Sequence, residues 1–152
     1  YPVNKKKIIN NKIKHRESFR PFAPSILKDL YNKYYQKNHD SPFMLIATFL
    51  KLNDLILKKD IIATLHNDFS ARVQTVSKNT NKDYYQIINE FYKLSGVPVV
   101  LNTSFNDKGE PIVCSPIDAL KSFLKTNLDI LYLQNFRILK TKNNLKKIKK
   151  IL

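Results

Sequence analysis

Glycine is scarce in this sequence, with two residues in 152, Gly96 and Gly109. A Walker-type phosphate loop holds phosphate with closely spaced glycines, so this class of site is excluded. Cysteine occurs once, at Cys114, which excludes a disulfide framework and a cysteine-based zinc site. No apolar run approaches the roughly 20 residues of a membrane-spanning helix, and no signal-peptide pattern opens the chain. These absences predict a soluble, cytoplasmic domain with no membrane partner.

The rest of the composition is that of an ordinary globular domain. Apolar residues make up 43% and charged residues 26% of the chain, close to the average for soluble proteins. The length suits one sizeable core. The chain begins at Tyr1 rather than at a methionine, so we expect a piece of a longer protein. We expect a single domain over residues 12–140, a basic arm or linker over 1–11 and a Lys-rich tail over 141–152.

Acidic residues are few, because 12 Asp and Glu stand against 27 Lys and Arg, which gives a net charge of +15. Most of the surplus lies at the ends of the chain. Residues 1–20 carry seven basic residues and one Glu, and residues 140–152 carry six Lys and no acid. Such ends are typical of solvated segments. Nucleic-acid binding, which a strongly basic protein also suggests, is therefore unlikely for the body of the domain.

Arginine is rare among the basic residues, with four of 27. The richness in Lys suggests that Lys has replaced Arg wherever a bare positive charge is sufficient. Positions that keep Arg are then candidates for its planar, bidentate fork, which suits phosphate and carboxylate groups. We interpret Arg16, Arg20 and Arg72 in this way. Arg137, near the end of an expected strand, is interpreted as either part of a structural salt bridge or a chance occurrence.

Local patterns predict an α/β or α+β domain in which strands and about three helices are built around one sheet. Ser25, Asn81 and Ser115 are the expected helix caps, and Gly96 ends the second helix. The helices are expected over residues 25–37, 81–94 and 115–125. Apolar and alternating runs predict strands over 43–50, 61–66, 70–77 and 97–101, and a hairpin of 128–133 with 136–139.

Two basic segments are candidates for anion binding. Lys14 and Arg16 are two residues apart in a Pro-rich extended stretch and share a face, so they can hold one polyanion; a solvated basic strand is an equal alternative. Arg72 projects with Gln74 from an alternating, half-buried strand, where an Arg is costly without an anion or carboxylate partner. His66 and Asp68 lack a third ligand, which favours a hydrogen-bonding loop over a metal site.

A third polar segment, Asn102-Thr103-Ser104-Phe105-Asn106, directly follows the predicted buried strand 97–101. In open α/β sheets, ligands bind beyond the carboxyl ends of strands. Ser104 and Asn106 alternate about Phe105, so both can face a ligand while Phe105 anchors the loop. A turn that only caps the strand is the alternative. Together the polar segments predict a pocket for a polyanion or nucleotide.

The sequence motifs of these segments resemble those of the C-terminal domain of the NodU/CmcH family of O-carbamoyltransferases. The resemblance extends in order from about Asn11 to Lys140. Its motifs are K-x-R-E-x-F-R-P-F-A-P-S (Lys14–Ser25), S-P-F-M (Ser41–Met44), A-R-V-Q-T-V (Ala71–Val76), G-V-P-V-V-L-N-T-S-F-N-x-x-G-E-P-I-V (Gly96–Val113) and S-P-x-D-A (Ser115–Ala119).

The resemblance implies a YrdC-like α/β domain, a twisted mixed open sheet with about three flanking helices. It implies that this domain binds ATP and carbamoyl phosphate and forms carbamoyl-adenylate, with Mg²⁺ accompanying the ATP. It also implies a partner, an N-terminal actin-like domain in cis or in trans, which holds an iron-type metal and carbamoylates an acceptor hydroxyl. That half is not in this chain. The chain is therefore expected to be the adenylating part of a carbamoyltransferase, and no metal-ligating residue is implied in it.

Residue roles also come from the resemblance. Lys14 and Arg16 match a K-x-R element, and Ser104 with Asn106 matches an S-x-N element of YrdC-like folds. The implied catalytic residues are Lys14, Arg16 and Arg72. The implied substrate- and nucleotide-binding residues are Met44, Asn102, Ser104 and Asn106.

Two positions depart from the family pattern. Phe69 and Gln134 stand where a glycine is common, which puts any close backbone approach at Phe69 in doubt. Two other functions remain open at this point. One is a non-enzymatic basic YrdC-like module that binds nucleic acid. The other is a purely structural partner of the transferase half.

Overall fold

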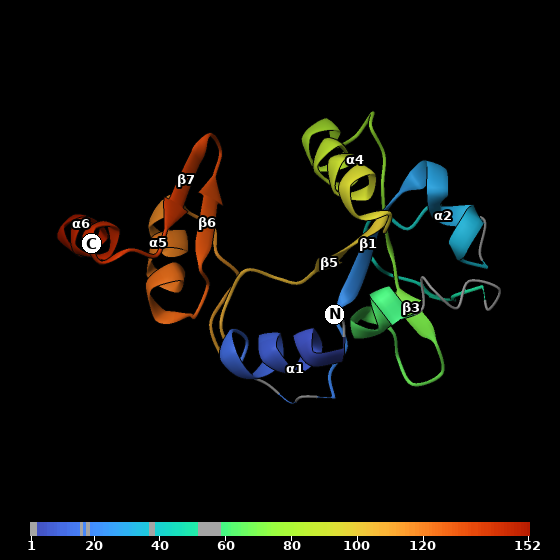
Figure 1. Ribbon diagram of the computed structural model, residues 1–152, viewed down its shortest axis with the longest axis horizontal. Coiled ribbons are helices and arrows are strands. Elements are labelled where there is room, and N and C mark those ends of the chain that lie inside the picture. The colour runs from blue at the N-terminus through green and yellow to red at the C-terminus, as the bar shows by residue number, and fades with distance from the viewer. Residues whose placement is uncertain (1–2, 16, 18, 37–38, 52–58) are drawn as a thin grey trace. The chain divides into compact units, whose positions relative to one another are not determined.

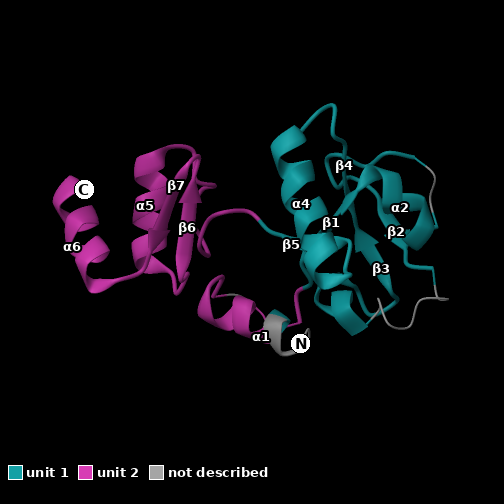
Figure 2. Ribbon diagram, turned by 45° about the horizontal axis from the view of Figure 1, so that its top comes forward, with its two compact units in different colours: residues 1–6, 21–103 teal, residues 7–20, 104–152 magenta. Residues whose placement is uncertain are grey.

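The computed structural model describes residues 3–15, 17, 19–36, 39–51 and 59–152. The chain divides into two compact units, which Figure 2 colours separately. Unit 1 comprises residues 1–6 and 21–103, and unit 2 comprises residues 7–20 and 104–152. Helix α1 (Val3–Lys12) contributes residues to both units. Figure 1 shows the order of the elements along the chain, and each unit is described by itself below.

Unit 1 is built on a three-stranded mixed sheet with β1 (Ala23–Leu27) at its centre. Strand β4 (Gln74–Val76) pairs with β1 in parallel, and Ser25 lies beside Gln74. Strand β5 (Val99–Asn102) pairs with the other edge of β1 antiparallel, and Ala23 lies beside Asn102. Paired residues and alternate residues of a strand share a face. Ser25, Gln74 and Asn102 therefore project from the same face of this sheet.

The predicted helix over 25–37 begins later than expected, and the prediction that Ser25 caps it is wrong. Ser25 is fully buried in β1, and helix α2 (Lys28–Tyr34) starts three residues further on. A capping residue is a local signal, and here the pairing of β1 with two neighbouring strands prevails over it. Ile26 and Leu27, directly after Ser25, are also buried.

The remaining strands of unit 1 are shorter than predicted. Strand β2 (Ala47–Phe49) pairs antiparallel with β3 (Ser70–Arg72) in a separate two-stranded sheet. The strand expected over 70–77 is thus divided at Val73 into β3 and β4. The strand expected over 61–66 is wrong, because this segment contains a 3-10 helix, η1 (Ile62–Thr64). A short apolar run does not distinguish a buried strand from a buried helical turn.

Helix α4 (Lys82–Ser95) confirms the second predicted helix at both ends. The Asn81 side chain accepts a hydrogen bond from the Tyr84 N–H, and Gly96 has a left-handed φ of 71° at the C-terminus. The helix lies across β1 and β5 (Figure 2). Its Ile88 is fully buried in a cluster with Leu27 and Val76, so α4 covers one face of the sheet.

A second cluster fills the space between α2 and the strands of unit 1. Tyr31 and Tyr35 stack with ring centroids 5.6 Å apart, and both are buried together with Ile26, Leu50 and Val73. Aromatic pairs of this kind add to the stabilisation that burial alone provides. The core of unit 1 therefore joins both of its sheets.

Unit 2 contains α5 (Pro116–Lys125), β6 (Ile130–Leu133), β7 (Phe136–Leu139) and α6 (Lys142–Ile151). Ser115 and Asp118 form a capping box at the start of α5, as the sequence predicts. Strands β6 and β7 form the predicted hairpin around residues 134–135. Figure 1 shows α5 beside this hairpin. Phe123 of α5, Leu131 of β6 and Ile148 of α6 are buried in one cluster.

These elements confirm the predicted α/β class with open sheets. The described strands form one three-stranded mixed sheet and two antiparallel pairs rather than the single sheet expected. Helices α2, α4 and α5 correspond to the three that the sequence predicts. Helices α1 and α6 are additional, because both basic ends of the chain are helical. The domain boundaries proposed from the sequence, 12–140 with an arm and a tail, stay a prediction.

Candidate functional site

A buried lysine in unit 2 lies at the centre of the first group of predicted site residues, the lysine cluster (Lys14, Ser104 and Asn106). The Lys14 side chain is only 6% exposed. Its Nζ lies 2.9 Å from the Ser104 carbonyl oxygen and 3.5 Å from the Ser104 Oγ. It also lies 2.5 Å from the Asn106 carbonyl oxygen and 2.8 Å from Asn106 Oδ1. The structure therefore brings the K-x-R lysine and the S-x-N pair together across 90 residues of sequence.

The loop of the lysine cluster is held by bonds of its own. Ser104 Oγ donates to Asn106 Oδ1 at 2.6 Å, and Asn106 Nδ2 donates to the Glu110 carbonyl oxygen at 2.8 Å. The Val113 N–H donates to the Phe105 carbonyl oxygen at 2.9 Å. Phe105 also packs against the core of unit 2, so it anchors the loop as the alternation about it predicts. Lys14 thus lies against a preorganised set of oxygens.

A second contact joins the same two segments beside Lys14. His15 Nδ1 donates to the Asp107 carboxylate, with distances of 2.8 and 3.0 Å to its two oxygens. Burial alone would raise the pKa of Asp107, but the hydrogen bonds from His15 and from the Lys108 N–H hold the pKa of this carboxyl below its usual value. Asp107 is therefore charged at neutral pH. It places a negative charge one residue beyond Asn106.

The second group of site residues lies in unit 1 on one face of the β4-β1-β5 sheet. We call it the amide cluster (Ser25, Met44, Gln74 and Asn102). Gln74 Oε1 accepts hydrogen bonds from Ser25 Oγ at 2.8 Å and from Asn102 Nδ2 at 2.7 Å. Asn102 Nδ2 also lies 3.6 Å from Met44 Sδ. The predicted site residues Met44 and Asn102 are therefore neighbours, and Gln74 links them to the centre of the sheet.

Met44 has an unusual backbone conformation for a predicted site residue. Its φ angle is 57°, in the left-handed region that favours glycine. The Met44 N–H donates to the Ser41 carbonyl oxygen at 3.5 Å, and Ser41 is itself tied to Thr75 of β4 by two hydrogen bonds. The S-P-F-M segment is thus held against β4. This arrangement places the Met44 thioether beside Asn102.

Arg72 lies on β3 of unit 1, where its side chain is exposed while Ala71 and Val73 are buried. The predicted half-buried strand with Arg72 projecting from it is confirmed, but the side chain projects into solvent, so the expected cost of leaving it without a partner does not arise. No carboxylate of the part of the chain that the structure describes lies within 4.0 Å of its guanidinium. An exposed guanidinium needs no partner in the protein. The role of Arg72 therefore rests on the family motif.

The other three arginines provide less evidence for an anion-binding role. Arg16 lies outside the described residues. Arg20 forms an exposed ion pair with Glu17 at 3.8 Å, a kind of contact that contributes little. Arg137 of β7 is exposed, and the salt bridge expected for it is not found with any residue of the described ranges.

His66 and Asp68 form a hydrogen-bonding loop, as the sequence favours. Asp68 Oδ1 accepts from the Ser70 N–H at 2.9 Å and from Ser70 Oγ at 2.7 Å, and these bonds lower the pKa of Asp68. His66 Nδ1 lies 2.9 Å from the same Ser70 hydroxyl. Within the described ranges, no group of three or more His, Cys, Asp or Glu residues is placed to hold a metal ion.

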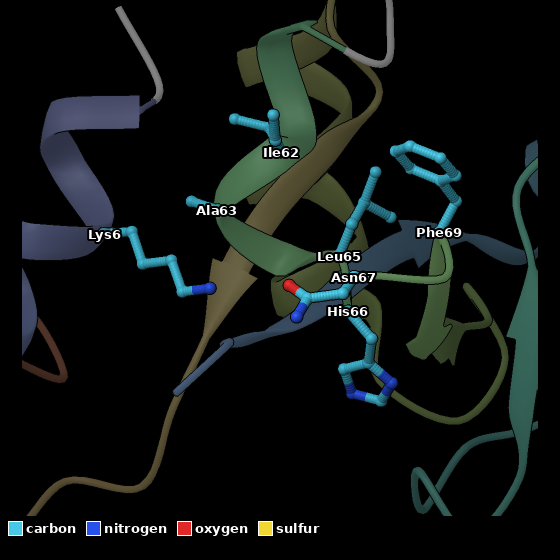
Figure 3. A pocket seen from close by; sticks show the side chains of 7 residues that line it. All are labelled: Lys6, Ile62, Ala63, Leu65, His66, Asn67 and Phe69. Carbon is cyan, nitrogen blue, oxygen red and sulfur yellow. The ribbon is translucent and has the colours of Figure 1, made fainter. Parts of the chain in front are cut away.

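A cavity of about 410 Å³ in unit 1 lies next to this loop (Figure 3). Its walls are Lys6, Ile62, Ala63, Leu65, His66, Asn67 and Phe69. Figure 3 shows Lys6 on its helix extending toward the segment that carries Asn67. Of the predicted catalytic and binding residues that the structure describes, none lines this cavity. It is therefore a separate feature of unit 1.

Sequence reasoning missed three residues that organise these clusters: Ser25, Gln74 and Asp107. The signal for Gln74 was available, because it alternates with the buried Thr75 of β4 and shares the motif of Arg72. Ser25 was assigned to a helix cap, which hid its place in β1. Asp107 is paired with His15 across 92 residues of sequence, and no local pattern predicts such a pairing.

The fold is that of an α/β domain, and each unit gathers a cluster of polar side chains, around Lys14 in unit 2 and around Gln74 in unit 1. The comparison with known families identifies it further. Residues 2–140 match the carbamoyltransferase C-terminus family, and the chain belongs to this family. The match includes every predicted site residue from Lys14 to Asn106. The resemblance to NodU/CmcH proteins is thereby confirmed.

Similar proteins come from archaea and bacteria. The chain is 48% identical over 139 residues to an uncharacterized protein of Methanocaldococcus jannaschii, covering 91% of this chain and 26% of that protein. It is 41% identical over 143 residues to nodulation protein NolNO of Sinorhizobium fredii, with 91% and 20% covered. It is 39% identical to nodulation protein NolO of Bradyrhizobium diazoefficiens, with 91% and 25% covered. The chain thus spans a fifth to about a quarter of these curated relatives.

No helix in the described ranges combines the length and apolar character needed to cross a lipid bilayer.

Proposed function

We propose that this domain is the adenylating part of an O-carbamoyltransferase of the cytoplasm. It binds ATP with Mg²⁺ together with carbamoyl phosphate and forms carbamoyl-adenylate. An actin-like transferase domain, in cis or in trans, then passes the carbamoyl group to an acceptor hydroxyl. The proposal is supported by membership of the carbamoyltransferase C-terminus family. The observation that carries it is the contact of Lys14 with Ser104 and Asn106.

The chemistry of the step explains why cations and amides are needed. Carbamoyl phosphate is hydrolysed to carbamate and inorganic phosphate. A carbamate oxygen then attacks the α-phosphorus of ATP, a new O–P bond forms, and pyrophosphate leaves. Carbamate is a poor nucleophile, and the attack builds negative charge on the phosphoryl oxygens. Positioning and charge stabilisation therefore provide most of the catalysis, as in phosphoryl transfer generally.

The residues of this chain have distinct parts in the proposal. Lys14, Arg16 and Arg72 neutralise the charge on the phosphates. Ser104 and Asn106 hydrogen-bond the carbamoyl group or phosphate oxygens, and the Ser104 hydroxyl turns its proton from Asn106 Oδ1 to the ligand when it does so. Because the Lys14 ammonium has three protons and already meets oxygens of Ser104 and Asn106, it binds a phosphate by exchanging one of these bonds. Met44 packs its apolar side chain against the base.

The test is release of pyrophosphate when the 152-residue chain is mixed with Mg-ATP and carbamoyl phosphate. We expect saturable ATP binding and pyrophosphate release that depends on both substrates. Arg72→Ala is the sharpest variant, because Arg72 is exposed and its removal leaves no partner unpaired. We expect it to lower the rate about 100-fold, the effect of removing one preorganised charge-stabilising donor.

Arg137→Ala is the matched control, since Arg137 is also an exposed arginine on a strand, and its rate should equal that of the unmodified chain. Absence of both ATP binding and pyrophosphate release would overturn the proposal. An Arg72→Ala rate equal to that of Arg137→Ala would remove Arg72 from the site.

A further inference from the structure

The amide cluster contains a chain of hydrogen bonds whose direction can be assigned from one atom. Gln74 Nε2 lies 3.2 Å from the Pro42 carbonyl oxygen. A carbonyl oxygen only accepts, so the Gln74 amide must turn its NH₂ group toward Pro42. Its Oε1 then faces the other way, toward Ser25 and Asn102. The orientation of Gln74 is thus determined by the backbone of the S-P-F-M segment.

The same logic determines the orientation of Asn102. Gln74 Oε1 is an acceptor, so the Asn102 group that lies 2.7 Å from it must be the NH₂ group. The second contact of that nitrogen is Met44 Sδ at 3.6 Å, and a thioether sulfur is also a weak acceptor. Both protons of Asn102 Nδ2 therefore have acceptors inside the amide cluster.

Asn102 Oδ1 consequently points away from Gln74. It makes no hydrogen bond with any residue that the structure describes, and the Asn102 side chain is half-buried. An acceptor that loses its water to a ligand is costly unless the ligand donates a hydrogen bond in return, as an amino group does. A ligand that presents an oxygen or a methyl group there does not.

The sheet makes this orientation rigid. Ser25 is fully buried and sits beside Gln74 in the register of β1 and β4, while Asn102 lies across from Ala23 on β5. The three side chains therefore come from three paired strands. Gln74 accepts from both neighbours at 2.8 and 2.7 Å. Rotation of the Asn102 amide by half a turn would place two oxygens against each other.

We propose that Gln74 is a positioning residue that presents Asn102 Oδ1 as a fixed hydrogen-bond acceptor, and that the ligand group bound there is a planar amino group. This inference rests on the proposed function, which offers two sources of such a group. One is the exocyclic amine of adenine in ATP, and the other is the NH₂ of carbamoyl phosphate. The amide cluster thereby sets the specificity of the site for one of these ligands over an analogue without the amine.

Two ligand pairs distinguish the sources. Inosine triphosphate has a carbonyl where ATP has its amine, and acetyl phosphate has a methyl group where carbamoyl phosphate has NH₂. Calorimetry with the full chain measures the four dissociation constants. We expect the amino ligand of one pair to bind about tenfold more tightly than its analogue, the effect of one matched hydrogen bond in place of an unpaired acceptor.

The variants are chosen to leave no buried hydroxyl unpaired. Gln74→Leu alone would orphan Ser25 Oγ, so it is made together with Ser25→Ala. Ser25→Ala alone is the matched control, because Gln74 then keeps its bonds to Pro42 and Asn102, and the tenfold preference should persist. In the double variant the Asn102 amide can turn. The ratio of the two dissociation constants in the pair should then fall from about ten to between about one and two, mainly because the amino ligand binds more weakly.

Asn102→Ala is a second variant that does not depend on the buried part of the cluster, and it should abolish the same preference. If Gln74 has only a structural role, the double variant should bind both ligands of a pair more weakly by the same factor. An unchanged ratio of their dissociation constants would therefore overturn the inference. Equal affinities within both pairs for the unmodified chain also overturn it, while ATP binding itself would leave the proposed function standing. If neither ATP nor carbamoyl phosphate binds, both proposals fall.

Discussion

At the scale of single residues, backbone strain accompanies the candidate site. Among the residues that the structure describes, four other than glycine have left-handed φ angles: His15, Met44, Phe69 and Gln134. This conformation costs a residue with a side chain about 1–2 kcal/mol. It persists where surrounding contacts impose it, and such positions cluster at functional sites. Met44 contacts Asn102, and His15 is hydrogen-bonded to Asp107, so two of the four belong to the clusters or border them.

Phe69 shows that a departure from the family pattern need not change the backbone. It stands where a glycine is common, yet its φ angle of 63° is one that glycine adopts easily. Its N–H donates to the His66 carbonyl oxygen at 3.1 Å, and its ring packs against the core of unit 1. The loop before Arg72 therefore keeps a glycine-type turn, with packing of the ring offsetting the strain.

Gln134 has the same strain without compensating packing, which yields a prediction. It is exposed in the loop between β6 and β7, with a φ of 49°. Gln134→Gly should stabilise unit 2 by up to about 1 kcal/mol, since glycine adopts this φ without steric cost but loses more entropy on folding. Urea unfolding measures the change. Gln134→Ala is the control and should give no gain, because alanine keeps the strain. A gain with alanine equal to that with glycine would contradict this explanation.

At the scale of elements, helices with caps at both ends were predictable and segments defined by distant pairing were not. Asn81 and Gly96 delimit α4, and Ser115 begins α5, as local chemistry dictates. Ser25 has the same capping chemistry but lies in β1, because β4 and β5, about 50 and 75 residues further along the chain, pair with it on either side. Such pairings are invisible to patterns a few residues long.

In the candidate site, too, residues carried by motifs were predictable, whereas contacts that depend on the register of the strands were not. Lys14, Ser104 and Asn106 were predictable together because family motifs carry them, and the structure brings them into contact. Gln74 was assigned correctly to a projecting position, but its bonds to Ser25 and Asn102 depend on the register of three strands. The roles of Arg16 and Arg72 stay predictions.

The capping box of α5 gives a prediction about pH. Asp118 Oδ2 accepts from the Ser115 hydroxyl at 2.7 Å and from the Ser115 N–H at 3.1 Å, and the bond from the hydroxyl is the main reason that the pKa of Asp118 is lowered. A carboxyl with a lowered folded-state pKa stabilises above its unfolded pKa of about 4, and that stabilisation is lost as pH falls through the folded value.

Asp118→Asn should therefore destabilise unit 2 at pH 7, while the difference between the two chains should shrink as pH falls below about 4. Denaturant unfolding at several pH values measures this difference. Asp129 is a suitable control position, because it lies in the loop after α5 and is exposed, so Asp129→Asn should leave stability unchanged at neutral pH. A difference that stays constant down to acid pH would show that the carboxylate charge is not what stabilises the cap.

At the scale of the whole molecule, the basic ends take part in the fold more than their composition suggests. Both form helices, α1 and α6. In α6 the lysines lie on one side and Ile148 on the other, and Ile148 is buried with Ala119, Phe123 and Leu131. Lysine side chains at such positions keep their ammonium groups in water while an apolar face packs. The charge of the tail is solvated, but its helix contributes to the core of unit 2.

The packing of α6 can be tested with two isoleucines of the same helix. Ile148 is 5% exposed, whereas Ile151 is 68% exposed. Ile148→Ala should destabilise unit 2 by about 2–5 kcal/mol, the cost of removing a buried branched side chain and leaving a cavity. Ile151→Ala removes the same atoms from the surface and should change stability by less than about 0.5 kcal/mol. Both are read from thermal or urea unfolding of the full chain. Equal effects of the two substitutions would mean that α6 is only an attached tail, and the ends of the chain would then act through charge alone.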